Sequence, residues 1–208
     1  WCLAGDLMEI LRPEIDAFPG PGPGLTPDPE TVGRWREWVS NTAAGRPAIG
    51  VCWRSGSVAG HRRRHYPALT DCGSLLQREN TFFVVLQYDE CSAEIAQATV
   101  GRGSEIAMPP GLDRREDQDG VAALMSALDL VVSADTAVLA LAGAIGAPTV
   151  GFALHPGWVG LGQRDHPWFS RVERVYRAPD IPWAEAMGAV AARTEEMLKV
   201  VGARMSGR

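Results

Sequence analysis

A loop of glycine, serine and arginine residues has the composition of a diphosphate-binding site. It follows the apolar run from Ala48 to Trp53 and continues to Tyr66. Small residues let backbone N–H groups approach an anion, and guanidinium groups fork onto phosphate oxygens. A solvated basic loop is the alternative, but a position directly after the first strand of an α/β unit favours phosphate binding. The residues offered for this role are Arg54, Ser55, Gly56, Ser57 and Arg64.

A second anion site is expected where a helix begins after Asp135. The first N–H groups of a helix lack intrahelical partners, and the helix dipole favours negative charge there. We expect Thr136 and Ala137 to offer these groups to a phosphate, with the Thr136 hydroxyl as a further donor. Asp135 has two interpretations, as the N-cap of this helix or as an acceptor for sugar hydroxyls. The residues alone favour the cap.

Polar residues also follow the apolar run from Thr81 to Gln87. Asp89 and Glu90 come directly after it. Carboxylates in this position hold ribose hydroxyls in nucleotide-binding sheets. We therefore expect Gln87, Asp89 and Glu90 to contact a ribose or base, although a solvated turn explains the two acids equally well.

Several familiar chemistries are not indicated. The sequence contains no G-x-G-x-x-G after a strand, no G-x-x-x-x-G-K-[ST], no H-E-x-x-H and no G-x-S-x-G. The histidines His61, His65, His155 and His166 are scattered. We expect neither a metal ion nor a tightly bound cofactor.

The stretch from Leu130 to Phe152 must position the second site. Leu130 to Val132 has the length and composition of a buried strand, and Ser133 to Asp135 is expected to turn the chain. Thr136 to Ile145 predicts an apolar helix that is buried on nearly all sides. Thr149 to Phe152 predicts a second strand, parallel to the first. Neither segment is long enough to span a bilayer.

Strands and helices alternate along the rest of the chain. Strands are predicted at 48–53, 81–87, 105–108 and 172–176, and helices at 30–42, 67–78, 92–99, 120–128 and 182–201. This order is typical of an α/β fold, a Rossmann-like open parallel sheet with helices on both faces. Ligands of such sheets bind at the carboxyl ends of the strands.

Composition limits the class of protein. The 208 residues are 46% hydrophobic with a formal net charge of -5, which argues against a nucleic-acid partner. Cys2, Cys52, Cys72 and Cys91 form no Cys-x-x-Cys pair. Without a zinc or disulfide pattern, a reducing compartment is expected, and we place the protein in the cytoplasm.

A Pro- and Gly-rich segment divides the chain. Residues 19–29, with the sequence PGPGPG at their centre, cannot hold regular structure. We expect 1–29 to be the tail of a preceding domain plus a linker, and 30–208 to be one Rossmann-like domain that binds a nucleotide sugar. The chain starts at Trp1, so it looks like a piece of a longer protein.

The central motif resembles a known family. The string LVVSADTAVLALAGAIGAPTVGF resembles the D-[ST]-x-x-x-H-L-A-x-A-x-G-x-P segment in the carboxyl half of heptosyltransferase-like glycosyltransferases, which have two Rossmann-like domains (the GT-B architecture). Together with IGVCWRSG, GHRRRHYPAL, VVLQYDE and DHPWF, it makes 30–201 similar to the region that ends many bacterial tetratricopeptide-repeat proteins.

The resemblance implies roles for particular residues. Arg64 falls where the family places a cation for the donor diphosphate, and Glu90 lies near the ribose-binding acid. Asp135 and Thr136 fall on the Asp-Ser/Thr pair at the donor sugar and phosphates. Ala140 departs from the pattern, since the family has a histidine there. A phosphate or hydroxyl contact is therefore missing.

The resemblance implies the donor-binding half of an inverting glycosyltransferase, with a nucleoside-diphosphate sugar as donor and an unidentified acceptor hydroxyl. The catalytic base is expected outside this chain, in the amino-terminal domain or repeats, so the isolated chain should not transfer sugar. One alternative is a non-catalytic interaction domain, which Ala140 favours. A weaker alternative is half of a sugar-nucleotide epimerase.

Overall fold

A computed structural model describes residues 6–18, 24–56, 59–100, 105–163 and 166–206. In this part of the chain, six strands form one sheet in which every pairing is parallel, with the order β3-β2-β1-β4-β5-β6. The strands are β1 (Ala48–Cys52), β2 (Phe82–Val85), β3 (Ile106–Ala107), β4 (Leu130–Ala134), β5 (Thr149–Ala153) and β6 (Val172–Tyr176).

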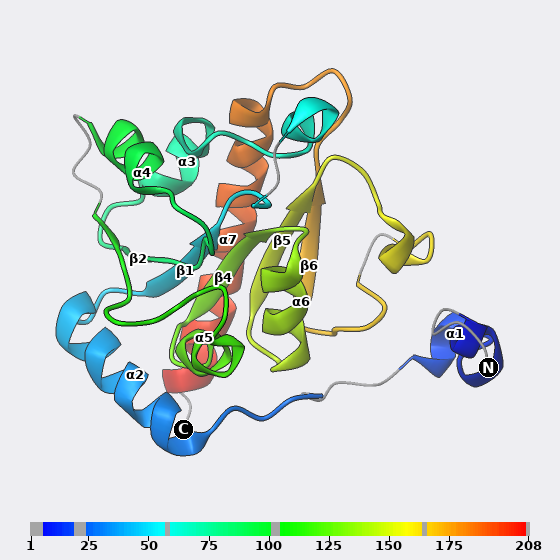
Figure 1. The fold of residues 1–208 in the computed structure, drawn as a ribbon, viewed down its shortest axis with the longest axis horizontal. Helices are drawn as coiled ribbons and strands as arrows, with labels where there is room; N and C mark the ends of the chain where they lie inside the picture. The colour runs from blue at the N-terminus through cyan, green and yellow to red at the C-terminus, as the bar shows by residue number, and fades with distance from the viewer. Residues whose placement is uncertain (1–5, 19–23, 57–58, 101–104, 164–165, 207–208) are drawn as a thin grey trace.

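Helices cover both faces of this sheet (Figure 1). The side chains of one face pack on α3 (Gly73–Leu76), α4 (Ser92–Thr99) and α7 (Trp183–Ser206). The other face packs on α2 (Pro29–Ala43), α5 (Gln118–Met125) and α6 (Ala137–Ala144). The predicted fold class, a Rossmann-like α/β sheet with helices on both faces, is confirmed.

The burial of the central strands explains why their positions could be predicted from the sequence. Every residue of β1, β2 and β4 is buried, so these strands appear as unbroken apolar runs rather than alternating patterns. In the register, Val51 pairs with Val132 of β4 and Val85 of β2. The central unit β4-α6-β5 forms as predicted, with Val132 opposite Val150.

Three details of the predicted elements were wrong. Ser133 and Ala134 belong to β4 and are buried, so the turn begins only at Asp135. The helix α6 is not buried on nearly all sides, because Ala137 and Ala140 are exposed. Apolar composition alone did not distinguish small exposed alanines from core residues.

The third wrong detail is the single helix predicted at 67–78. The segment instead forms the 3-10 helix η3 (Leu69–Cys72), followed by the four-residue α3. The Asp71 carboxylate accepts the backbone N–H of Ala68 at 2.9 Å, which tightens this first turn. A further 3-10 helix, η2 (Gly60–His65), lies within the predicted basic loop.

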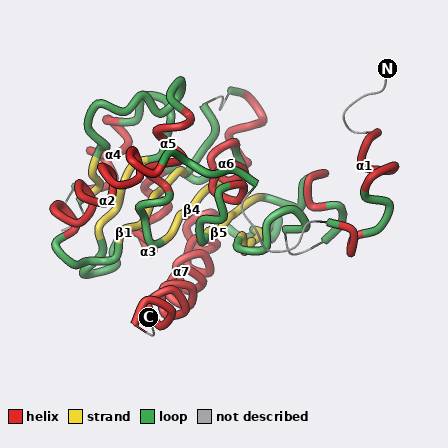
Figure 2. The backbone as a smooth tube through the Cα atoms, turned by 90° about the horizontal axis from the view of Figure 1, so that it is seen from below, coloured by secondary structure: helices red, strands yellow, loops and turns green. Residues whose placement is uncertain are grey.

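The amino-terminal segment lies to one side of the sheet (Figures 1 and 2). It contains α1 (Asp6–Leu11) and the 3-10 helix η1 (Ile15–Ala17). Phe18 packs edge-on against Trp168, with ring centroids 4.7 Å apart. The described part of the predicted linker, from Gly24 to the start of α2, contains no helix or strand, and Gly24 and Leu25 donate to the Ala144 carbonyl at the end of α6.

None of the helices in the described ranges is long and apolar enough to cross a membrane.

Candidate functional site

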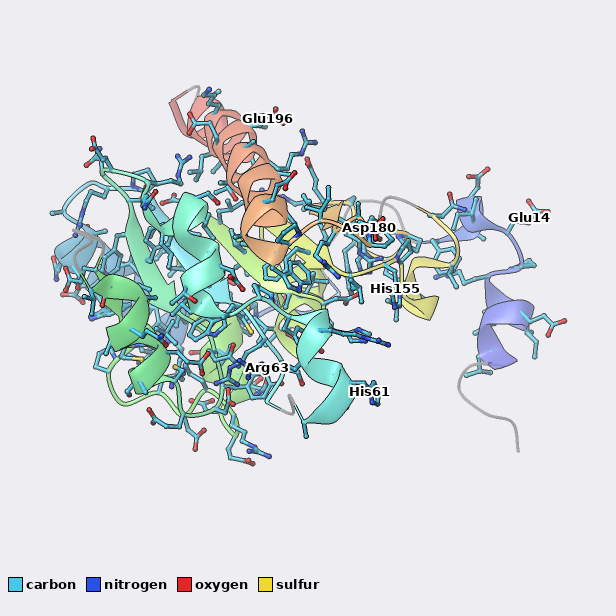
Figure 3. The ribbon with its side chains drawn as sticks, turned by 90° about the horizontal axis from the view of Figure 1, so that it is seen from above. Glu14, His61, Arg63, His155, Asp180 and Glu196 are labelled. Carbon is cyan, nitrogen blue, oxygen red and sulfur yellow. The ribbon has the colours of Figure 1, made fainter. Side chains whose placement is uncertain are left out.

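The strand order reverses between β1 and β4, which are neighbours in the sheet although two other strands separate them in the sequence. This is the position where Rossmann-like sheets bind their ligands. At this point the carboxyl end of β1 meets the start of α6, because Sγ of Cys52, the last residue of β1, lies 3.9 Å from Thr136 Oγ1. Figure 3 views the molecule from above this edge, with His61 and Arg63 of η2 and His155 of a neighbouring loop labelled.

The N-cap of α6 is Thr136, not Asp135. Thr136 has extended backbone angles, and its hydroxyl accepts the N–H of Val138 at 3.3 Å. Asp135 lies one residue too early to reach this donor, so the predicted capping role of Asp135 was wrong. Ala137 is exposed beside the cap, where the free N–H groups of the first turn suit an anion.

The Asp135 carboxylate is therefore left for another role. Its side chain is 29% exposed, and one of its oxygens lies 3.9 Å from Nη2 of Arg174 in β6. A cavity of about 130 Å³ opens beside it. The other residues that line this cavity are His65, Tyr66, Phe152, Ala153, Leu154, His155 and Gly157. This placement matches the second interpretation, in which Asp135 accepts sugar hydroxyls, and that contact stays a prediction.

Arg54 does not point freely toward a ligand. Its guanidinium Nε lies 3.0 Å from both carboxylate oxygens of Glu94 in α4, and Nη1 lies 2.5 Å from Asp89. Hydrogen bonding to Glu94, ahead of the opposing effect of burial, raises the pKa of Arg54. Two carboxylates thus neutralise this cation, and the geometry gives Arg54 a structural role in place of the predicted phosphate contact.

Gln87 is also a structural residue. It is 0% exposed, and its carboxamide accepts from the Arg54 N–H at 3.2 Å and donates to the Arg54 carbonyl at 3.0 Å. A side chain so enclosed cannot contact a ribose, so this predicted role of Gln87 was wrong. Gln87 also donates to Asp89 at 2.7 Å. Burial opposes ionisation of Asp89, but hydrogen bonds from Arg54 and Gln87 lower its pKa.

Glu90 is the more available of the two acids after β2. It is exposed, and one carboxylate oxygen accepts the Ser92 N–H at the start of α4 at 2.7 Å. This hydrogen bond lowers the pKa of Glu90. A ribose contact by Glu90 stays a prediction.

Tyr88 holds the loop after β1, a role that the sequence did not suggest. Its hydroxyl accepts the Gly56 N–H at 2.7 Å and lies 3.4 Å from Ser55 Oγ. A Cβ atom on Gly56 would lie 2.9 Å from the Tyr88 ring. The glycine thus allows the close approach that the loop requires. Ser57 lies outside the described residues.

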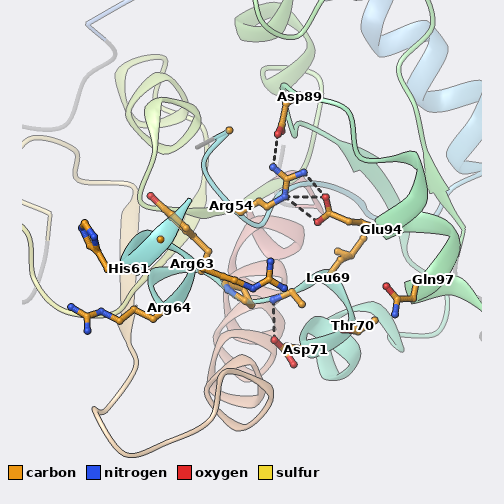
Figure 4. A pocket seen from close by; sticks show the side chains of 15 residues that line it. Arg54, His61, Arg63, Arg64, Leu69, Thr70, Asp71, Asp89, Glu94 and Gln97 are labelled. Atoms are coloured by element: carbon orange, nitrogen blue, oxygen red, sulfur yellow. Dashed lines mark hydrogen bonds and ion pairs between the residues drawn. The ribbon is translucent and has the colours of Figure 1, made fainter. Parts of the chain in front are cut away.

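A larger cavity of about 830 Å³ lies between η2, η3 and α4 (Figure 4). Arg63 and Arg64 of η2 line it, together with the Arg54 cluster. In Figure 4 the guanidinium of Arg64 extends away from that cluster. The salt bridges found in the described ranges do not include Arg64. Its charge is available, whereas the charge of Arg54 is neutralised.

Tyr66, directly after η2, lines both cavities, so the two hollows are adjacent. His65 faces the smaller one, and its ring centroid lies 5.8 Å from that of His155. Burial, together with Arg64 and His155, lowers the pKa of His65. A neutral imidazole at this position donates or accepts a hydrogen bond without adding positive charge.

The described residues contain neither a metal-binding cluster nor a reactive thiol. No cluster of three or more His, Cys, Asp or Glu side chains that could hold a metal ion occurs in the described ranges. Cys52, Cys72 and Cys91 are free and buried. Burial raises the pKa of the Cys52 thiol to about 12, so this thiol stays protonated and unreactive at neutral pH.

Comparison with known proteins supports the fold. No protein-family model matches the chain. Protein FlbA from Caulobacter vibrioides is 35% identical over 191 residues, which is 92% of this chain and 32% of that protein. The chain therefore spans about a third of the length of the curated relative it matches.

Solved structures with the same fold are glycosyltransferases. A glycosyl transferase family 9 protein from Veillonella parvula has a TM-score of 0.63 at 13% identity, covering 93% of this chain and 58% of that one. The E. coli ADP-heptose lipopolysaccharide heptosyltransferase II has a TM-score of 0.56 at 16% identity, covering 86% and 57%. The E. coli heptosyltransferase WaaC with ADP has a TM-score of 0.50 at 19% identity, and the match covers 78% of this chain and 48% of that one. The chain thus has a Rossmann-like α/β fold that matches about half of each of these heptosyltransferase-like structures.

Proposed function

We propose that this chain is the donor-binding domain of an inverting glycosyltransferase and binds a nucleoside-diphosphate sugar. The observation that carries the proposal is that the carboxyl end of β1 meets the α6 N-terminus at the point where the strand order reverses, with Asp135 beside a cavity. A diphosphate suits the N–H groups at the start of α6, and a sugar suits the cavity beside Asp135.

Within this proposal, the phosphates lie against the N–H groups at Thr136 and Ala137 and against the available cation of Arg64. These groups stabilise the negative charge that develops on the nucleoside diphosphate as it leaves. Asp135 accepts hydroxyl protons of the donor sugar. Glu90 is the remaining candidate for the ribose, since Gln87 is buried and Asp89 is paired with Arg54.

In this proposal, the acceptor-binding site and the catalytic base belong to a part of the protein outside this chain. We propose that an amino-terminal domain or a set of tetratricopeptide repeats supplies them, in the cytoplasm. A cleft completed by a second domain excludes water from the donor. The isolated chain should therefore bind nucleoside diphosphates weakly and transfer no sugar, and turnover by this chain alone would contradict this division of roles.

Arg64→Ala tests the phosphate site. Calorimetric titrations with ADP, UDP and GDP should show affinity weaker by about 1.5 to 3 kcal/mol, the range for a charge-assisted hydrogen bond. Arg62→Ala is the matched control, because Arg62 is an exposed cation of the same 3-10 helix that does not line the cavity. Equal losses in both variants would show that only general electrostatic attraction is at work.

A non-catalytic interaction domain is the second candidate. Ala140, which stands where the resembled family has histidine, is exposed on α6. An exposed methyl group makes no hydrogen bond to a ligand, so a contact of the active family members is missing. A wild-type chain that binds none of the three nucleotides, while remaining folded, would favour this candidate.

A further inference from the structure

Arg174 is a buried cation beside the candidate site. It lies in β6 opposite Gly151 of β5, so its side chain points to the face covered by α6. Only 2% of its side chain is exposed. Nη1 donates to the Tyr176 hydroxyl at 3.1 Å, whereas Nε and Nη2 have no hydrogen-bond partner among the described residues.

A buried guanidinium with unused donors is costly unless an opposite charge is near. Asp135 provides that charge: its Oδ2 lies 3.9 Å from Nη2, and no other carboxylate in the described ranges forms an ion pair with Arg174. Within the described ranges, the other titratable groups that interact with the guanidinium are Tyr176 and His166. Burial, and then the charge of Arg174, lower the pKa of His166 to about 4, so His166 is neutral and does not compete for Asp135.

Asp135 needs such a partner to hold its orientation. The N-cap position of α6 belongs to Thr136, so no helix N–H fixes the Asp135 side chain. Gly160 packs closely on Arg174, because a Cβ atom on this glycine would lie 3.0 Å from Nη1. The glycine lets the chain pack directly on the guanidinium, which keeps Nη2 toward Asp135.

We propose that Arg174 is a positioning residue, which fixes the Asp135 carboxylate in one orientation at the cavity that receives the donor sugar. The sugar contact of Asp135 rests on the proposed function. The fixed orientation of Asp135 does not, so the two can be tested apart.

The first test uses the free chain. Three-bond NMR couplings of Asp135 report its χ1 angle and should show one staggered rotamer in the wild type and averaging in Arg174→Met. Arg171→Met is the control: Arg171 is exposed and bonds the Gly146 carbonyl at the other end of β6. Gly160→Ala is the second variant, since it displaces the guanidinium without removing its charge. If both perturbations left the Asp135 couplings unchanged, the inference would be overturned, whether or not a ligand binds.

The second test separates positioning from a general structural effect. Arg174→Met should weaken binding of ADP-glucose, UDP-glucose or GDP-mannose, whichever the wild type binds best, by about tenfold, with the matching nucleoside diphosphate unaffected. In an Asp135→Asn background, Arg174→Met should have no additional effect on sugar-nucleotide affinity.

Arg174→Lys should restore part of the affinity that Arg174→Met loses. Equal weakening of both ligands, or full additivity with Asp135→Asn, would contradict a positioning role. If the wild type binds no nucleotide, the proposed function fails, and the rotamer measurement alone decides on Arg174.

Discussion

Arg54 and Glu94 form an ion pair between the loop after β1 and the first turn of α4, with Nε of the guanidinium 3.0 Å from each carboxylate oxygen. Glu94 also accepts the indole N–H of Trp53 at 2.7 Å. One carboxylate therefore holds two successive residues of the loop that leads into the candidate site.

We predict that Glu94→Gln lowers the free energy of unfolding by about 2 kcal/mol, because Arg54 is largely buried and loses a charged partner. Urea denaturation measures this. Glu116→Gln is the control, since the Arg115–Glu116 pair is exposed on both sides and should contribute less than about 0.5 kcal/mol. Similar small effects in both variants would show that the Arg54 cluster adds little stability.

His166 should make stability depend on pH. The pKa of His166 is about 4 in the folded protein because burial, and then Arg174, disfavour the imidazolium, whereas the ordinary pKa of histidine is 6.5. The unfolded chain therefore binds a proton that the folded chain does not, and stability falls as pH drops from 6.5 toward 4. At about 1.4 kcal/mol per pKa unit, the loss approaches about 3 kcal/mol.

The His166 prediction is measured by urea unfolding between pH 7 and pH 4. In His166→Phe, whose ring retains the packing on Phe169, this part of the pH dependence should disappear. An unchanged slope in the variant would mean that carboxylates alone cause the acid sensitivity.

Thr136→Ala should lower stability by about 1 kcal/mol, because α6 loses the N-cap hydroxyl that accepts the Val138 N–H. Thr136→Ser keeps the hydroxyl and should remain close to wild type. Thermal unfolding of the two variants makes the comparison. An equal loss in both would assign the effect to the methyl group rather than to the cap.

Gly56→Ala should disturb the candidate phosphate loop. The new Cβ would lie 2.9 Å from the Tyr88 ring, and moving the ring breaks the hydrogen bond from the Gly56 N–H. We expect a destabilisation of about 1 to 3 kcal/mol, with weaker binding of nucleoside diphosphate. Gly33→Ala in α2 is the control, since nothing lies within 4 Å of its Cβ position. That change should stabilise the chain by up to about 1 kcal/mol.

Buried strands and several helices could be predicted from the sequence because their signals are local. The boundaries of α4 and β6 agree with those expected from the sequence. The apolar run Leu130 to Val132 predicted β4, and the order of strands and helices predicted a parallel sheet. Such patterns depend on neighbouring residues, which the sequence shows directly.

The site residues were harder to predict because their partners are distant in the sequence. Arg54 is neutralised by Glu94, 40 residues away, and Gln87 is enclosed by the backbone of Arg54, 33 residues away. Nothing local distinguishes a paired arginine from an available one such as Arg64. Arg174 was also missed, because its importance depends on a contact with Asp135 across two strands of the sheet.

The contact between η2 and α7 limits when the basic segment can fold during synthesis of the chain. The Trp183 indole donates to the Arg64 carbonyl at 3.0 Å across 119 residues, and η3 and α3 both pack on α7. A chain leaves the ribosome from its amino terminus, so the basic segment emerges well before the helix that anchors it. Until α7 has been synthesised, the arginines of η2 have no fixed place on the sheet. A nascent chain that ends before Trp183 should therefore contain every predicted phosphate contact and still lack the hydrogen bond that anchors η2.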